Sequence, residues 1–181
     1  MVNMKGIVKP VAAIAAAAVI LFGASAILSP IAAKNAEADL NEMMAYMVPG
    51  STTFTPEEYT GEDANITAVY KGETGYAVQT TVAGYAGDIV MMVGVDNDGK
   101  VTGLMVQKME ETYGLGEKAM TDYTFLMQYL HTAGEAAVGE DIDAITGATV
   151  TSKAVTKAVN SACAFVTGAD VSSSATEWGD W

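Results

Sequence analysis

Side chains able to carry chemistry gather in the segment 143–152, which reads DAITGATVTS. A helix is predicted to follow, because apolar residues recur there at three- and four-residue spacing, namely Val155, Ala158, Val159, Ala162, Phe165 and Val166. Thr151 or Ser152 suits the N-cap of this helix, and Gly168 stands where its end is expected. Helix N-termini favour phosphate through their free amides and dipole, so the segment predicts a phosphate-binding turn. The same residues also fit a plain turn and cap.

A second candidate segment, 110–118, reads EETYGLGEK. Gly114 and Gly116 bracket one leucine, and a residue without a Cβ allows the backbone to approach a flat ligand closely. Taken alone, the pattern is equally typical of a loop that leaves a strand. Neither segment predicts a hydroxyl nucleophile with its own general base, because the single histidine, His131, lies outside both.

The elements that must position these segments are strands followed by helices. Short apolar runs rich in valine, isoleucine and threonine alternate with turn residues, and they predict strands at 66–70, 76–82, 89–95 and 101–106. The turn 96–99, which reads DNDG, predicts a tight hairpin between the last two strands. Helices are expected at 35–47, at about 123–131 and after residue 152. We therefore predict an α+β fold with an antiparallel β-meander and late helices.

The beginning of the chain predicts a membrane anchor. Residues 11–33 carry no charged side chain, and as a helix they would be about 34 Å long, enough to cross a hydrocarbon core of about 30 Å. Lys5 and Lys9 precede this run, which favours an N-terminus inside the cell and a domain outside it. A cleavable signal peptide is the competing interpretation, since A-x-A-like sites are present, but the length of the run favours a retained anchor.

Composition excludes one class of partner. The chain has 22 acidic residues, nine lysines and no arginine, and its formal net charge is −13. Nucleic acid is excluded, because a surface that follows phosphates needs clustered basic residues. Cys163 is the only cysteine, so no internal disulfide can form, and a small buried residue is the expected role. A lone histidine gives no basis for a metal site.

Both candidate segments resemble one protein family. The letters DAITGAT at 143–149 look like the acceptor motif of proteins that carry FMN as a phosphoester on a threonine. The letters ETYGLG at 111–116 are similar to the Glu-Thr-Pro-Gly-Leu-Gly segment of the same proteins, with Tyr113 in place of proline. Met109 stands where the family often has histidine. The family comprises flavin subunits of Rnf-type ferredoxin:NAD oxidoreductases and of sodium-pumping NADH:quinone oxidoreductases. The short anchored chain looks more like the Rnf G subunit.

The resemblance implies that a flavin transferase esterifies the Thr149 hydroxyl with FMN. The chain would then be an electron-relay subunit of an ion-translocating ferredoxin:NAD oxidoreductase, with no catalytic residue of its own. Leu115, Tyr113 and Met109 are the candidate contacts of the flavin ring. The further candidate cofactor-binding residues implied by the two motifs are Asp143, Thr146, Gly147, Ala148, Thr151, Lys153, Glu111, Thr112, Gly114 and Gly116.

The implied partners are other membrane subunits, iron–sulfur or flavin subunits, and the transferase during maturation. In this interpretation the chain is a single-pass protein of the cell membrane with its flavin domain on the outer face. Its parts are a cytoplasmic N-terminus at 1–10, a transmembrane helix at 11–33, a helix and connector at 34–62, an FMN-binding domain at 63–168 and an acidic tail at 169–181. Two alternatives stay open: an anchored flavin carrier that feeds an extracellular acceptor, and a non-redox anchored interaction domain.

Overall fold

The computed structural model describes residues 35–169. The predicted anchor at 11–33 and the tail from residue 170 onward therefore lie outside the described residues. Within 35–169, no helix is both long enough and apolar enough to cross a membrane. Residues 35–47 are helical, as the spacing of their methionines and leucine predicts.

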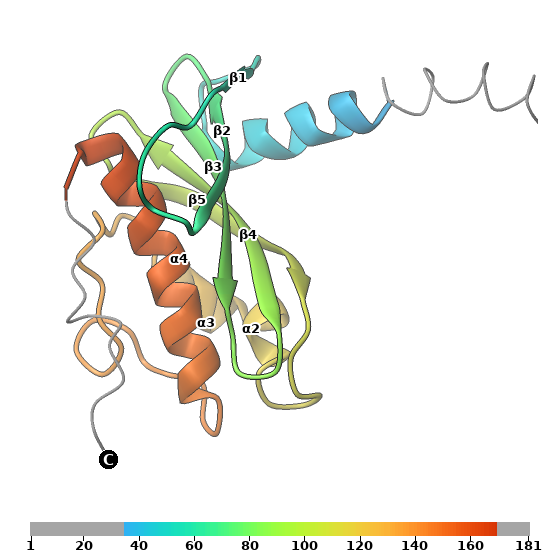
Figure 1. Ribbon diagram of the computed structural model, residues 1–181, viewed down its shortest axis with the longest axis vertical. Helices are drawn as coiled ribbons and strands as arrows, with labels where there is room; N and C mark the ends of the chain where they lie inside the picture. The colour runs from blue at the N-terminus through green and yellow to red at the C-terminus, as the bar shows by residue number, and fades with distance from the viewer. Residues whose placement is uncertain (1–34, 170–181) are drawn as a thin grey trace, which may run out of the picture. The chain divides into compact units, whose positions relative to one another are not determined.

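A five-stranded antiparallel sheet forms the centre of the domain, with its strands in sequence order (Figure 1). The predicted meander is confirmed in β2 to β5, and the α+β class with it. The short first strand was not predicted, because Pro56 interrupts it; proline is tolerated there because β1 is an edge strand. The strands are β1 Thr55–Glu57, β2 Ile66–Lys71, β3 Gly75–Ala83, β4 Asp88–Asp96 and β5 Val101–Met109.

The predicted hairpin between β4 and β5 is confirmed. The Asp96 side chain accepts hydrogen bonds from the backbone N–H groups of Asp98, at 3.0 Å, and Lys100, at 2.8 Å. Gly99 adopts a φ of +82°, a conformation that glycine reaches without steric cost. This turn fixes the register in which β5 leads into the segment 110–118.

Within the described residues, three helices follow the sheet: α2 Lys118–Thr121, α3 Tyr123–Met127 and α4 Thr149–Thr167. Asp122 caps α3, because its side chain accepts hydrogen bonds from the N–H groups of Thr124 and Phe125. The helix expected to reach residue 131 ends four residues earlier, and a turn follows in which His131 has a φ of +70°. Gly168 ends α4 in the left-handed conformation, as predicted.

The core lies between α4 and the sheet face formed by β3 and β4 (Figure 1). Val155, Ala158 and Val159 on α4 are fully buried against strand residues such as Met91 and Val93. Burying a side chain of this size contributes roughly 1.5–3 kcal/mol. Cys163 is fully buried in the same core, as predicted, and burial raises the pKa of its thiol to about 12.

The opposite face of the sheet is crossed by the chain at Met47. Gly94 of β4 and Gly103 of β5 lie directly beneath it, and a Cβ at either position would collide with the Met47 backbone. The Thr102 hydroxyl donates a hydrogen bond of 2.6 Å to the Met47 carbonyl. This contact holds the segment against the sheet, so that both faces of β4 are buried.

Candidate cofactor site

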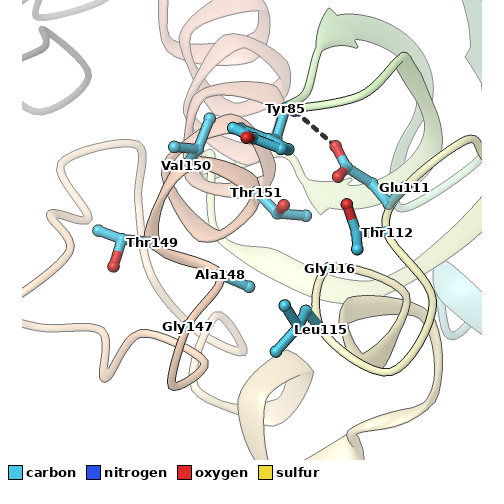
Figure 2. Close-up of a pocket in the computed structure, with 10 residues that line it drawn as sticks. All are labelled: Tyr85, Glu111, Thr112, Leu115, Gly116, Gly147, Ala148, Thr149, Val150 and Thr151. Atoms are coloured by element: carbon cyan, nitrogen blue, oxygen red, sulfur yellow. Dashed lines mark hydrogen bonds between the residues drawn. The ribbon is translucent and has the colours of Figure 1, made fainter.

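A pocket of about 420 Å³ opens where the loop after β5 meets the beginning of α4 (Figure 2). Its wall combines residues of the segments 110–118 and 143–152, which are the two candidate segments of the sequence analysis. A third contribution comes from the turn between β3 and β4. The lining residues are Tyr85, Glu111, Thr112, Leu115, Gly116, Gly147, Ala148, Thr149, Val150 and Thr151.

The two segments touch at glycine positions. A Cβ on Gly147 would lie 3.2 Å from the Leu115 Cδ2 atom, so the leucine packs directly on the turn before α4. A Cβ on Gly116 would lie 2.8 Å from both the Thr151 Oγ1 and the Glu111 Oε2 atoms. Larger residues at 147 or 116 would therefore push the two walls apart. The glycines allow the walls to approach each other and leave an open pocket beside them.

The turn before α4 is held by Ser152 rather than capped by it. The Ser152 hydroxyl is buried, accepts a 3.0 Å hydrogen bond from the Ile145 N–H and donates a 2.9 Å hydrogen bond to the Ala148 carbonyl. The prediction that Thr151 or Ser152 is the N-cap is therefore wrong. The helix begins at Thr149, and the N-cap is Ala148, which makes no side-chain cap. The serine bridges the turn from inside the first turn of the helix.

The beginning of α4 consequently presents free amides. N–H groups in the first turn of a helix have no intrahelical acceptor, and Ala148 supplies none from its side chain. Gly147 adopts a φ of +78°, which brings the chain sharply into the helix. This arrangement favours an anionic group such as a phosphate.

Thr149 stands at the rim of this pocket. Its side chain is exposed, at the first position of α4, and Figure 2 shows it on the side of the helix away from Glu111. Thr151, two residues later, is 1% exposed and faces the Glu111 side. Of these two hydroxyls, only that of Thr149 is accessible to a large modifying enzyme.

Glu111 connects the loop to the β3–β4 turn. Its Oε1 atom accepts hydrogen bonds from the N–H groups of Tyr85, at 2.6 Å, and Ala86, at 3.4 Å. Tyr85 itself is 71% exposed and forms part of the pocket wall. Sequence reasoning missed Tyr85 and Val150. The glycines around Tyr85 mark a turn, but no local pattern connects that turn with Glu111.

Several predicted site residues do not line the pocket. Tyr113 is 89% exposed and does not line the pocket, and Met109 packs against the core. Asp143 is exposed, and its backbone pairs with the Gln128 side chain, at 2.8 Å and 3.3 Å. The remaining predicted residues outside the wall are Thr146, Gly114 and Lys153. Their roles toward a ligand stay predictions.

No group of three or more metal-ligating side chains occurs within residues 35–169. The pocket wall instead offers amides, hydroxyls, one carboxylate and the apolar Leu115 and Tyr85. Such a mixture suits an organic ligand that combines a flat apolar ring with a phosphate.

Comparison with known proteins gives the class of this domain: residues 84–164 match the model of the FMN-binding domain. The chain is 33% identical over 153 residues to the G subunit of the proton-translocating ferredoxin:NAD(+) oxidoreductase complex of Clostridium ljungdahlii, a match that covers 78% of this chain and 79% of the relative. It is 32% identical over 139 residues to the G subunit of the ion-translocating oxidoreductase complex of Methanosarcina acetivorans, covering 69% and 73%.

A third relative is the G subunit of the Na(+)-translocating ferredoxin:NAD(+) oxidoreductase complex of Acetobacterium woodii, 40% identical over 95 residues. That match covers 48% of this chain and 46% of the relative, so the chain spans about half the length of some relatives that it matches. The chain belongs to the family of G subunits of ion-translocating oxidoreductase complexes. The family resemblance drawn from the two motifs is thereby confirmed.

Proposed function

We propose that this chain is an electron-relay subunit of a membrane-bound, ion-translocating ferredoxin:NAD oxidoreductase, and that it carries FMN as a phosphoester on Thr149. The observation that carries the proposal is the pocket itself. An exposed threonine stands at its rim, free helix amides lie beside that threonine, and an apolar and glycine-lined wall faces them. FMN needs one region for a phosphate and another for a flat ring, and the pocket offers both.

The residues of the pocket fit FMN in two further respects. The Glu111 Oε2 atom is buried and has no hydrogen-bond partner within the described residues, as expected where a ligand supplies the partner. Gly116 allows the loop to pack closely against the opposite wall, because a Cβ there would lie 2.8 Å from an oxygen atom of both Glu111 and Thr151. Leu115 would pack against the ring, and the first-turn amides of α4 would bind the phosphate.

Attachment requires a separate transferase. The Thr149 Oγ1 atom would form a bond to the FMN phosphorus of FAD, the P–O bond of the pyrophosphate would break, AMP would leave, and the hydroxyl proton would pass to a base. No histidine lies in the two pocket-forming segments, and we propose that the transferase supplies that base. Covalent attachment retains the cofactor in a domain that faces the outside of the cell.

Bound FMN supplies electron transfer in steps of one or two electrons, and the protein sets its position and its surroundings. The Thr149 ester would fix one end of the cofactor. Leu115 and Gly116 would line one side of the cofactor, and Glu111 would contribute a charge. Electrons would arrive from one partner protein of the complex and leave to another, and the proposed anchor at 11–33 would hold the chain beside them.

The experiment that tests this proposal is an intact-mass measurement on protein purified from native membranes, together with the identification of co-purifying subunits. We expect a mass that exceeds the sequence by FMN less one water, with other membrane and iron–sulfur or flavin subunits in the sample. A flavin adduct without partner subunits would favour a stand-alone carrier. A mass equal to that of the sequence would contradict the flavin proposal and favour an interaction domain.

A further inference from the structure

Only one of the two oxygen atoms of the Glu111 carboxylate has hydrogen-bond donors within the described residues. Its Oε1 atom receives the N–H groups of Tyr85 and Ala86. Its Oε2 atom is buried and has no partner, and the ion pairs within residues 35–169 do not include Glu111. A buried carboxylate oxygen without a donor is costly, because it has lost its water without replacement. Such an atom therefore points to a donor that belongs to a ligand.

Position distinguishes this oxygen from the other buried acceptors. Four buried side-chain atoms lack a partner within the described residues, and they belong to Asp63, Thr80, Asn160 and Glu111. Only Glu111 also lines the pocket. Its Oε2 atom lies next to Gly116 and Thr151, as the contacts of a Cβ at position 116 show. In Figure 2 the carboxylate faces Thr151 from the wall opposite Thr149.

We propose that the Glu111 Oε2 atom accepts a hydrogen bond from a ring N–H of the bound flavin, and that its charge lowers the flavin's reduction potential. The inference rests on the proposed function, since it assigns a role within the same site. The isoalloxazine ring carries one imide N–H, at N3 between two carbonyl groups. A carboxylate acceptor suits this edge, whereas Thr149 at the other end holds the phosphate.

The sign of the effect follows from electrostatics. Reduction adds electron density to the ring, and a negative charge within hydrogen-bond distance opposes that addition. The effect is stronger in a pocket shielded from water. Replacing the carboxylate by a neutral amide of the same shape should therefore raise the reduction potential.

A purely structural role predicts a different result. If Glu111 only ties the β3–β4 turn to the loop, then glutamine would serve equally well, because its amide oxygen can still accept from the Tyr85 N–H. The structural role and the ligand-binding role differ at the Oε2 position, which faces the pocket. Glu111→Gln places N–H groups there in place of the buried acceptor. Those groups would repel a ring N–H.

The test is a redox titration of full-length protein produced together with its flavin transferase. Glu110→Gln is the matched control, because Glu110 is the exposed neighbour and bonds to Lys108 instead, at 2.8 Å. We expect Glu111→Gln to favour the reduced flavin at least tenfold at a given potential. This corresponds to a rise of about 59 mV for a one-electron couple. Glu110→Gln should leave the potential where it is.

If the flavin is attached to the Glu111→Gln variant and its reduction potential is unchanged or lowered, the inference is overturned. A wild-type protein without flavin would instead contradict the proposed function. Wild-type protein labelled with ¹⁵N in its flavin provides a second test that needs no variant. We expect the N3 proton to be visible by NMR and slow to exchange with solvent. A proton that exchanges as fast as in free FMN would overturn the inference even if Glu111→Gln does not fold.

Discussion

The two walls of the pocket are built in opposite ways. On the α4 side, Ala148, Thr151 and Ser152 are buried, and Ser152 bonds the helix to the turn before it. On the loop side, Thr112 and Leu115 are exposed, and Tyr113 is almost fully so. That loop is held mainly where Glu111 bonds to the β3–β4 turn and where Gly116 packs against the helix.

This difference indicates that the two walls have different functions. If Thr149 carries FMN, as proposed, its hydroxyl must be presented to the transferase in one geometry, and the buried, hydrogen-bonded turn would provide that geometry. The wall that faces the ring would have to accept the ring after attachment, and an exposed loop with glycines can adjust to it. Changes on the α4 side should therefore alter attachment, whereas changes on the loop side should alter the properties of a flavin that is still attached.

The largest effect is expected from Ser152→Ala. The change leaves the Ile145 N–H buried without an acceptor, which costs about 1–3 kcal/mol of unfolding free energy. The loosened turn should also reduce the fraction of molecules that carry flavin. Urea unfolding and intact mass measure the two effects. Thr146→Ala, at an exposed position in the same turn, is the control for stability and should leave the free energy of unfolding unchanged.

A smaller loss of stability is expected from Gly114→Ala. Gly114 has a φ of +74° with open space around it, so alanine would suffer backbone strain of about 1–2 kcal/mol but no collision. Gly139→Ala is a matched control, since Gly139 has a φ of +91° and equally open surroundings away from the pocket. Both variants should lose similar stability. Only Gly114→Ala should shift the flavin absorption spectrum, and equal spectra would show that the loop does not contact the ring.

Tyr129→Phe tests whether the core beneath α4 is separate from the pocket. The Tyr129 hydroxyl bonds to the Thr156 hydroxyl at 2.8 Å, and its loss should cost about 0.5–1.5 kcal/mol. Thr156 keeps its bond to the Ser152 carbonyl, so the turn before α4 should hold its geometry. Thermal unfolding should record the loss while flavin content stays at the wild-type level. A fall in flavin content would show that the two regions are coupled.

The smallest effect is expected at Glu73, which lies in the turn between β2 and β3 and does not line the pocket. Hydrogen bonds from its own backbone N–H, the Thr53 hydroxyl and the Thr52 N–H lower the pKa of Glu73 to about 2. Because the pKa is lower in the folded state, the stabilisation is present above about pH 4.5 and is lost as the pH falls toward 2. Glu73→Gln should reduce the loss of unfolding free energy between pH 4.5 and pH 2. The flavin content and the flavin spectrum should stay at the wild-type level. If the pH dependence of stability is the same in Glu73→Gln and in the wild type, the lowered pKa of Glu73 does not stabilise the fold.

Much of the fold was predictable from local patterns. In β4, Ile89, Met91, Val93 and Val95 alternate toward the core, and α4 repeats its apolar residues at helical spacing. These patterns mark strands and helices wherever one face is buried. The edge strand β1 was missed because Pro56 is a strong turn residue, and only the pairing of this segment with β2 makes it a strand.

The pocket was predictable only in part. Motif resemblance marked both segments, and the structure brings them together. The beginning of α4 was misplaced because Thr151 and Ser152 are good caps locally, whereas the buried Ser152 hydroxyl bonds back to Ile145 and Ala148 instead. The contact between Glu111 and Tyr85 joins two turns that are distant in sequence. Contacts of that kind depend on tertiary packing, which no local pattern reports.

Mapping the flavin to a single residue tests the central claim most directly. Trypsin cleaves after lysine, so complete digestion of native protein should release residues 119–153 as one peptide that contains Thr146, Thr149 and Thr151. We predict that this peptide carries FMN less one water and that fragmentation places the added mass on Thr149. Attachment at Thr146 or Thr151, or a peptide without the added mass, would contradict the claim.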